Sequence, residues 1–205
     1  VESQLRANLV TDESILNSFL TILYENFLPE KLKSIAYVDD LININDNRFL
    51  LRPFILGKLI SNLNLDLKFN ILDIGSCTGY SSAILSKLFK KVYSVESDKH
   101  CFEESKINIS KSKILNIRLF NQNYNELNLE DNKFDNILIN GAINANPLYL
   151  INFLKLNGKL LTIFNDGTNS YAACYIKKKK SFDKVRIFDA SSPLLINYKN
   201  KAPVF

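Results

Sequence analysis

The sequence predicts an α/β fold: a mostly parallel sheet with helices on both faces, a C-terminal antiparallel hairpin and an N-terminal helical extension. From residue 70 onward, apolar runs of strand length alternate with segments that have helical spacing. This alternation is typical of parallel strands joined by crossover helices. Near the end, two strand-like runs flank the lysine run Lys177–Lys180, which indicates an antiparallel hairpin with a solvated turn.

The expected elements follow from these patterns. Strands are expected at 70–74, 91–95, 116–120, 134–139, 158–164, 171–178 and 184–189. Helices between them are expected at 79–89, 98–111 and 146–155. Consecutive elements of this kind are usually neighbours in space, so all these strands are assigned to one sheet.

The N-terminal region is expected to be mostly helical. Residues 1–28 carry apolar side chains at helical spacing, with Thr11 as the expected N-cap and Pro29 as the stop. The segment 36–47 has no clear period and is expected to be irregular. Because proline is tolerated in the first turn of a helix, a further helix is expected from Pro53 to residue 63.

Composition narrows the classes of function. With 205 residues, 46% hydrophobic and 23% charged, the chain fits one soluble domain, with a helical cap at 1–52 and a core at 53–205. Its apolar runs are shorter than the roughly 18 residues of a membrane span. The net charge of +5 is mostly scattered, so no nucleic-acid partner is expected. The three cysteines are odd in number and lack metal-ligand spacing, which predicts free thiols in a reducing cytoplasm and no metal site.

The stretch NILDIGSCTGYSSAIL at 70–85 carries the strongest functional signal. A strand, a turn from Gly75 to Gly79 and a helix follow one another. Glycines let the backbone approach a ligand, and the start of the helix presents free N–H groups. The next strand ends at Glu96, roughly 20 residues after the turn, where an acid can accept hydrogen bonds from ribose hydroxyls. The pattern therefore predicts a nucleoside-containing cofactor.

The spacing within the turn separates two cofactor classes. Dinucleotide-binding turns carry G-x-G-x-x-G, whereas this turn has glycines only at its first and fifth positions. With Asp73 two residues before Gly75, it resembles motif I of the Rossmann-like class I S-adenosylmethionine-dependent methyltransferases, with Cys77 in place of the middle glycine. The resemblance implies S-adenosylmethionine as the cofactor. It implies cofactor-binding roles for Asp73, Gly75, Ser76, Cys77, Gly79, Tyr80, Glu96 and, after the third strand, Asn123.

Segments outside the turn resemble one family of these enzymes, the protein-L-isoaspartate O-methyltransferases. They are Phe27–Pro29, Ala36–Asp40, Leu50–Ile55, Phe134–Ala142 and Leu156–Leu160. The resemblance implies methyl transfer to the carboxylate of an isoaspartyl residue in a damaged protein or peptide, that is, protein repair. A carboxylate is already an anion, so positioning should supply most of the rate, and no catalytic residue is assigned.

One departure from the family concerns the acceptor. Leu51 stands where the family places a serine or threonine that holds the substrate carboxylate, and leucine cannot donate a hydrogen bond. Isoaspartyl methylation is therefore expected to be weak unless Arg52 binds the carboxylate instead. Arg52 and Asn140 are the candidate substrate-binding residues. The alternative is a divergent family member that serves as an accessory subunit and docks on a partner protein.

Overall fold

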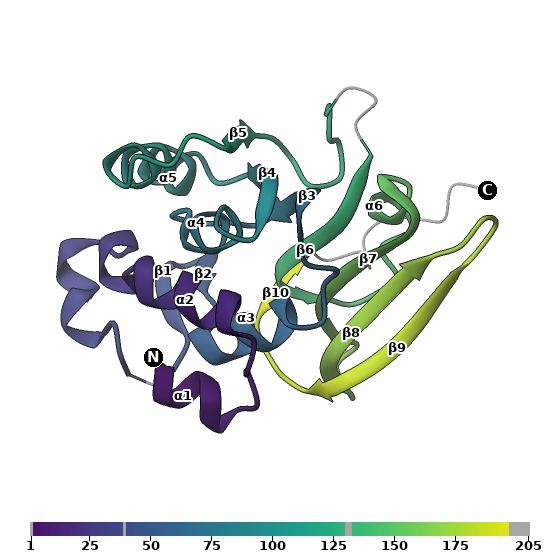
Figure 1. Ribbon diagram of the computed structural model, residues 1–205, viewed down its shortest axis with the longest axis horizontal. Coiled ribbons are helices and arrows are strands. Elements are labelled where there is room, and N and C mark those ends of the chain that lie inside the picture. Colours follow the sequence, from purple (N-terminus) through teal and green to yellow (C-terminus); the bar gives the residue numbers. More distant parts are fainter. Residues whose placement is uncertain (1, 39, 130–132, 197–205) are drawn as a thin grey trace.

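The computed structural model describes residues 2–38, 40–129 and 133–196 (Figure 1). Its centre is an eight-stranded sheet of order β5-β4-β3-β6-β7-β8-β9, with β10 paired to β6. The strands are β3 (Asp66–Ile74), β4 (Phe89–Glu96), β5 (Ile117–Asn121), β6 (Phe134–Ile143), β7 (Leu154–Asn165), β8 (Ser170–Lys177), β9 (Phe182–Asp189) and β10 (Leu194–Ile196). The strands β3 to β7 are parallel, and β8 and β9 are antiparallel. The predicted fold class is confirmed.

Two apolar clusters cover the two faces of this sheet. The larger contains the N-terminal cap together with one side of the sheet, and the smaller contains the other side with a short helix and the loop at 124–129. The helical elements are α1 (Glu2–Ala7), α2 (Glu13–Thr21), η1 (Tyr24–Phe27), η2 (Glu30–Ile35), α3 (Pro53–Ile60), α4 (Tyr80–Leu85), α5 (Lys99–Lys111) and α6 (Leu148–Ile151). In Figure 1 the cap helices gather beside α3 and α4, at the end of the molecule opposite the β8–β9 hairpin.

The cap differs from its prediction at the start of the second helix. Asp12, not Thr11, is the N-cap of α2, because its carboxylate accepts hydrogen bonds from the backbone N–H groups of Ser14 (2.8 Å) and Ile15 (3.2 Å). A carboxylate at this place also interacts favourably with the helix dipole. Within the region expected to be helical, Val1 lies outside the described residues.

Two further expectations are wrong. The segment 36–47 contains a strand, β1 (Ile42–Asn45), which pairs with β2 (Arg48–Leu50) as a small antiparallel hairpin. Its alternation of buried and exposed residues was a period-two signal too short to stand out. The helix expected at 146–155 is only α6, because residues from Leu154 onward extend β7 instead.

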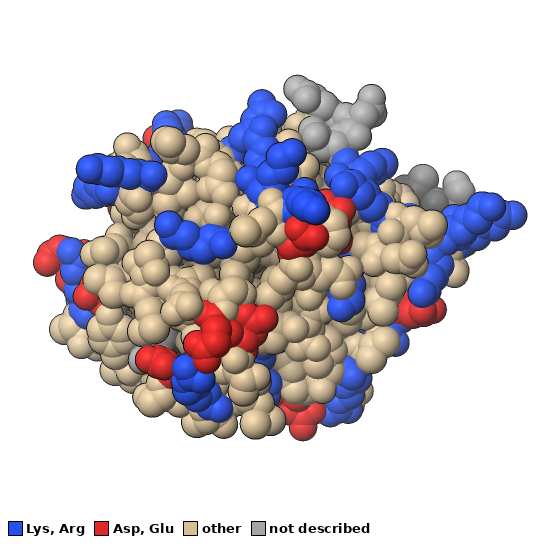
Figure 2. All heavy atoms as spheres, viewed as in Figure 1, with Lys and Arg blue, Asp and Glu red and all other residues tan. Residues whose placement is uncertain are grey.

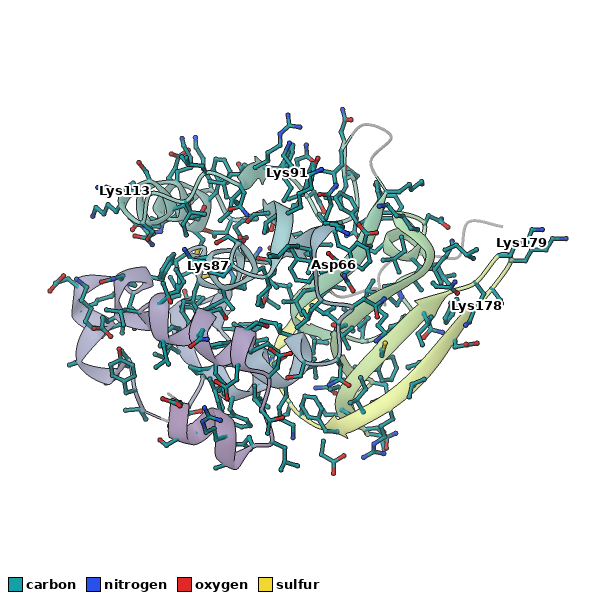
Figure 3. All side chains as sticks on the ribbon, viewed as in Figure 1. Asp66, Lys87, Lys91, Lys113, Lys178 and Lys179 are labelled. Carbon is teal, nitrogen blue, oxygen red and sulfur yellow. The ribbon has the colours of Figure 1, made fainter. Side chains whose placement is uncertain are left out.

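The charged surface matches the scattered pattern of the sequence on the face shown in Figure 2. There, basic side chains form separate groups, both at the rim and within the face, and acidic side chains lie next to several of them. Lys178 and Lys179 lie at the tip of the β8–β9 hairpin, as the lysine-rich turn predicted (Figure 3). Among the described residues, none of the helices has both the length and the apolar character needed to cross a membrane.

Candidate cofactor and acceptor site

The cofactor turn (residues 75–79) lies at the carboxyl end of β3, where the strand order of the sheet reverses. β4 pairs with one side of β3 and β6 with the other, and open α/β sheets bind ligands in the crevice at such a switch point. Three turn residues have left-handed backbone: Gly75 at φ 73°, Cys77 at φ 52° and Gly79 at φ 95°. A side chain there costs about 1–2 kcal/mol, so the backbone at Cys77 is strained.

Asp73 is a fully buried hub beneath the turn. Its carboxylate accepts hydrogen bonds from the hydroxyls of Ser81 (2.7 Å) and Ser82 (2.5 Å) on α4 and from Nδ2 of Asn140 (2.6 Å) on β6. Burial raises the pKa of Asp73 to about 6, although the three donors act in the opposite direction. Asp73 thus holds the start of α4 against β6. Because it is fully buried, its contribution to a cofactor site is to position the turn above it.

Glu96 is the second hub, at the end of β4, and is 1% exposed. Its Oε1 accepts hydrogen bonds from Arg48 Nε, the Tyr124 hydroxyl and the Asp98 N–H, each at 2.8 Å. Its Oε2 accepts from the N–H of Cys77 at 2.9 Å. Each carboxylate oxygen has about two acceptor sites, so Oε1 is fully used, whereas Oε2 has a single donor among the described residues.

Arg48 and Tyr124 are the site residues that sequence reasoning missed. The Arg48 guanidinium lies 5.6 Å from the centre of the Tyr124 ring, and its side chain is only 13% exposed. Arg48 comes from β2 and Tyr124 from the segment after β5, so no local motif connects them with Glu96. The one available signal is that Tyr124 directly follows Asn123, the position chosen from the family resemblance.

Cys77 and Cys101 are buried thiols whose sulfur atoms lie 3.5 Å apart. Contact with Cys101, together with burial, raises the pKa of Cys77, which therefore stays protonated. Potential metal-ligand atoms of Cys101, Asp98 and His100 lie within 4.8 Å of one another. These three residues follow closely in sequence at the start of α5, where Asp98 is the N-cap and accepts from the Cys101 N–H at 2.8 Å. Helix capping accounts for the grouping.

The remaining predicted cofactor residues separate into two groups. Ser76 stays in the turn, where its hydroxyl oxygen accepts from Ser94 at 2.8 Å, and Tyr80 packs its ring against the cap, 4.5 Å from the ring centre of Tyr24. Asn123 is exposed, and its side-chain oxygen accepts from the N–H of Asn125 at 3.0 Å. The structure therefore connects Tyr124, and not Asn123, with Glu96.

The two predicted acceptor residues, Arg52 and Asn140, line different spaces near the cofactor turn. Leu51 is buried and, with Gly75 and Asn140, lines a cavity of only about 10 Å³ over the turn. It also lines an open groove of about 390 Å³, which Arg52 shares. Arg52 lines a second groove, of about 340 Å³, and its guanidinium forms an ion pair with the exposed Asp40 at 3.1 Å. Leu51 thus borders both the cavity over the cofactor turn and a groove that contains Arg52.

The model of the protein-L-isoaspartate(D-aspartate) O-methyltransferase family matches residues 1–192 of the sequence. The chain belongs to this family. It is 28% identical over 162 residues to the protein-L-isoaspartate O-methyltransferase of Petrotoga mobilis, which covers 78% of this chain and 76% of that protein. It is 23% identical over 205 residues to the enzyme of Koribacter versatilis, with 99% and 91% coverage.

Solved structures of the family share the fold. A structure described as a beta-aspartate methyltransferase (PCMT) from Plasmodium falciparum, in complex with S-adenosyl-L-homocysteine, aligns with a TM-score of 0.83. The two chains are 22% identical, and the alignment covers 95% of this chain and 96% of that one. The fold is therefore that of a Rossmann-like methyltransferase, and membership of the family makes S-adenosylmethionine the cofactor. Of the family's N-terminal signature, Asp39 lies outside the described residues.

The residues around the turn fit such a cofactor in chemistry. Gly75 and Gly79 leave backbone uncovered by side chains of their own, and Glu96 offers a buried acid at the end of the neighbouring strand. The fit in volume is poor, because a small-molecule site measures about 300–1,000 Å³ and the cavity over Gly75 measures about 10 Å³.

Proposed function

We propose that this member of the family transfers a methyl group from S-adenosylmethionine to a carboxylate of a protein or peptide, and that Arg52 binds this carboxylate. The observation that carries the proposal is the position of Arg52 in both open grooves, next to the Leu51 wall of the cofactor cavity. Its only ion-pair partner among the described residues is Asp40, and both side chains are substantially exposed. Exposed pairs contribute about 0–1 kcal/mol, so a substrate carboxylate can replace Asp40 at little cost.

The chemistry asks for placement more than for acid–base catalysis. A carboxylate oxygen forms a bond to the methyl carbon while the carbon–sulfur bond breaks, which yields a methyl ester and S-adenosylhomocysteine without moving a proton. Arg52 would orient the carboxylate through two parallel hydrogen bonds. Leu51 would keep water from the reacting atoms, and Asn140 would hold the floor of the site through Asp73.

A methyl-transfer assay tests this role. Labelled S-adenosylmethionine is offered with an isoaspartyl peptide and, in parallel, with the same peptide carrying normal aspartate. Hydrogen bonds to charged groups contribute roughly 1.5–3 kcal/mol, so Arg52→Leu should lower kcat/KM by roughly 10- to 100-fold. Arg6→Leu is the matched control, because Arg6 is similarly exposed (45% against 42%) and ion-paired but lies on α1. Undiminished turnover in Arg52→Leu would exclude Arg52 as the carboxylate ligand.

A non-catalytic role as a partner-binding subunit is the second candidate. Two observations favour it: Leu51 at the position of the family's hydroxyl, and the small volume of the cavity over the turn. Such a protein would methylate neither peptide in the assay above, whether or not it keeps S-adenosylmethionine, and calorimetry measures cofactor binding separately. The first proposal includes repair of damaged protein in the cytoplasm. The three free cysteine thiols support this location, because free thiols suit a reducing compartment.

A further inference from the structure

Residues 191–196, called here the C-terminal strap, cross the cofactor turn. Within the strap, β10 adds to β6 as a parallel strand, with Leu194 opposite Ala142. The pairing of β3 with β6 reaches only Ile139, so β10 lies beside β6 beyond the end of β3 (Figure 1). The N–H of Ala142 donates to the carbonyl of Pro193 at 3.0 Å. The strap therefore occupies the crevice at the switch point of the sheet, where such sheets bind their ligands.

Leu195 is the strap residue that enters the site. A Cβ built on Gly75 would lie 2.3 Å from Cδ2 of Leu195, and one built on Gly141 would lie 2.7 Å from its Cβ. Leu195 thus packs directly on the backbone of both glycines, and Gly75 is the one that begins the cofactor turn. What remains over Gly75 is a cavity of about 10 Å³, room for one water at most.

The strap covers Gly75 beside this cavity and, apart from Ile196, which is 3% exposed, is less buried than the apolar residues that line the cavity. β10 has three residues, Leu194 is 43% exposed, and Leu195 is half-buried. Phe49 and Leu51, which line the cavity, are 6% and 5% exposed and belong to the larger core cluster.

We propose that the C-terminal strap is autoinhibitory: Leu195 fills the cofactor crevice, and S-adenosylmethionine binds only after β10 has left β6. The inference rests on the cofactor-dependent function proposed above. Strap release and cofactor binding are then one coupled equilibrium. The apparent dissociation constant of the cofactor equals its intrinsic value divided by the fraction of molecules whose strap is open.

Calorimetric titration of S-adenosylhomocysteine into the full chain tests the coupling. Leu195→Ala removes the side chain that covers Gly75 and should bind at least about tenfold more tightly, because the open fraction rises. Leu194→Ala is the matched control on the adjacent, outward-facing residue and should bind like the wild type. Thermal unfolding of each variant shows that folded protein is being compared.

Hydrogen exchange of the wild type gives a second readout that needs no variant. Saturating S-adenosylhomocysteine should speed exchange in peptides that contain residues 191–196, while the β7–β8 ladder should not change. Slower exchange in the strap, or weaker binding by Leu195→Ala than by the wild type, would make Leu195 a wall of the bound site and overturn the proposal. If none of the three proteins binds, the strap proposal and the enzymatic function fail together. Equal binding by all three proteins would reject the strap proposal and leave the enzymatic function standing.

Discussion

Asp73 and Glu96 occupy equivalent places at the ends of neighbouring strands, and each accepts at least three hydrogen bonds from its own chain. They differ in whether a positively charged side chain balances the buried carboxylate. Glu96 has the Arg48 guanidinium at 2.8 Å, whereas every neutralising partner of Asp73 is an uncharged hydroxyl or amide. Burying an unpaired carboxylate favours its protonated form, so the pKa of Asp73 is raised to about 6.

This difference predicts how stability depends on pH. Between about pH 4 and 6 the folded chain holds a proton on Asp73 that the unfolded chain has released, so the free energy of unfolding falls as pH rises through 6. The full effect is about 3 kcal/mol, since each pKa unit corresponds to about 1.4 kcal/mol. Asp73→Asn lacks this proton equilibrium. Its stability relative to the wild type should therefore improve by about that amount between pH 4 and pH 7.

Denaturant unfolding of the two proteins across this range is the measurement. Groups that titrate in both proteins cancel in the difference, and the hydrogen bonds lost by the substitution add a constant. A difference that does not vary with pH would show that Asp73 stays ionised in the folded chain.

At the scale of elements, the cofactor turn is held between α4 and α5. Gly79 is the N-cap of α4, with φ 95°, and its N–H donates to the carbonyl of Ser76 at 2.8 Å. A Cβ at Gly79 would lie 3.2 Å from both Ser105 and Ile109 of α5. A side chain at Gly79 would therefore crowd α5 as well as adopt an unfavourable backbone conformation.

Gly79→Ala should consequently destabilise the protein by more than the cost of placing an alanine in a left-handed backbone conformation. Gly167→Ala is the matched control, because Gly167 has φ 97° and open space where its Cβ would be. Both variants carry a backbone cost of about 1–2 kcal/mol, and Gly79→Ala should lose roughly 1–3 kcal/mol more through crowding. It should also weaken binding of S-adenosylhomocysteine, which Gly167→Ala should leave unchanged. Equal losses of stability in the two variants would show that α5 moves aside freely.

For the whole molecule, the N-terminal cap shares one apolar cluster with the sheet and does not form a separate core. Phe19 of α2 and Tyr24 of η1 pack their rings against Tyr80, the first residue of α4. Leu5 of α1 lies against Gly57 of α3. The cap residues also include Arg48, the ion-pair partner of Glu96, so the cap contributes to the cofactor site as well as to the fold.

If cap and core fold as one unit, damage to the cap must lower the stability of the whole chain. Phe19→Ala removes a buried ring and should cost about 3–5 kcal/mol, whereas Leu20→Ala, at a residue 49% exposed on the same helix, should change stability by about 0.5 kcal/mol or less. Deletion of residues 1–47 should lower the melting temperature further and increase binding of a hydrophobic dye.

Thermal unfolding followed by circular dichroism and by dye fluorescence makes these comparisons. A core that melts at an unchanged temperature in Phe19→Ala and in the truncated chain would mean that the cap is an independent arm. The partner-docking role would then gain support over the enzyme.

The sequence by itself determined the sheet and helix alternation, the cofactor turn and the two acids at its flanks. Each of these depends on patterns within about 20 neighbouring residues, such as apolar periodicity, glycine spacing and the end of a strand. The positive φ of Cys77 was decided only by the structure, although the sequence showed that Cys77 takes the place of a glycine in the turn. Short elements were less predictable: the β1 strand and the N-cap at Asp12 depend on a few residues whose local preferences compete.

Only the tertiary structure decided what surrounds those acids and what fills the crevice. Arg48 reaches Glu96 from β2, and Leu195 reaches Gly75 from the far end of the chain. Such contacts follow from the order and register of the strands, which bring distant segments together, and from side-chain packing at the point where they meet. No local sequence pattern predicts these contacts, because the residues next to Arg48 and Leu195 in the sequence do not indicate which distant residue each one will contact.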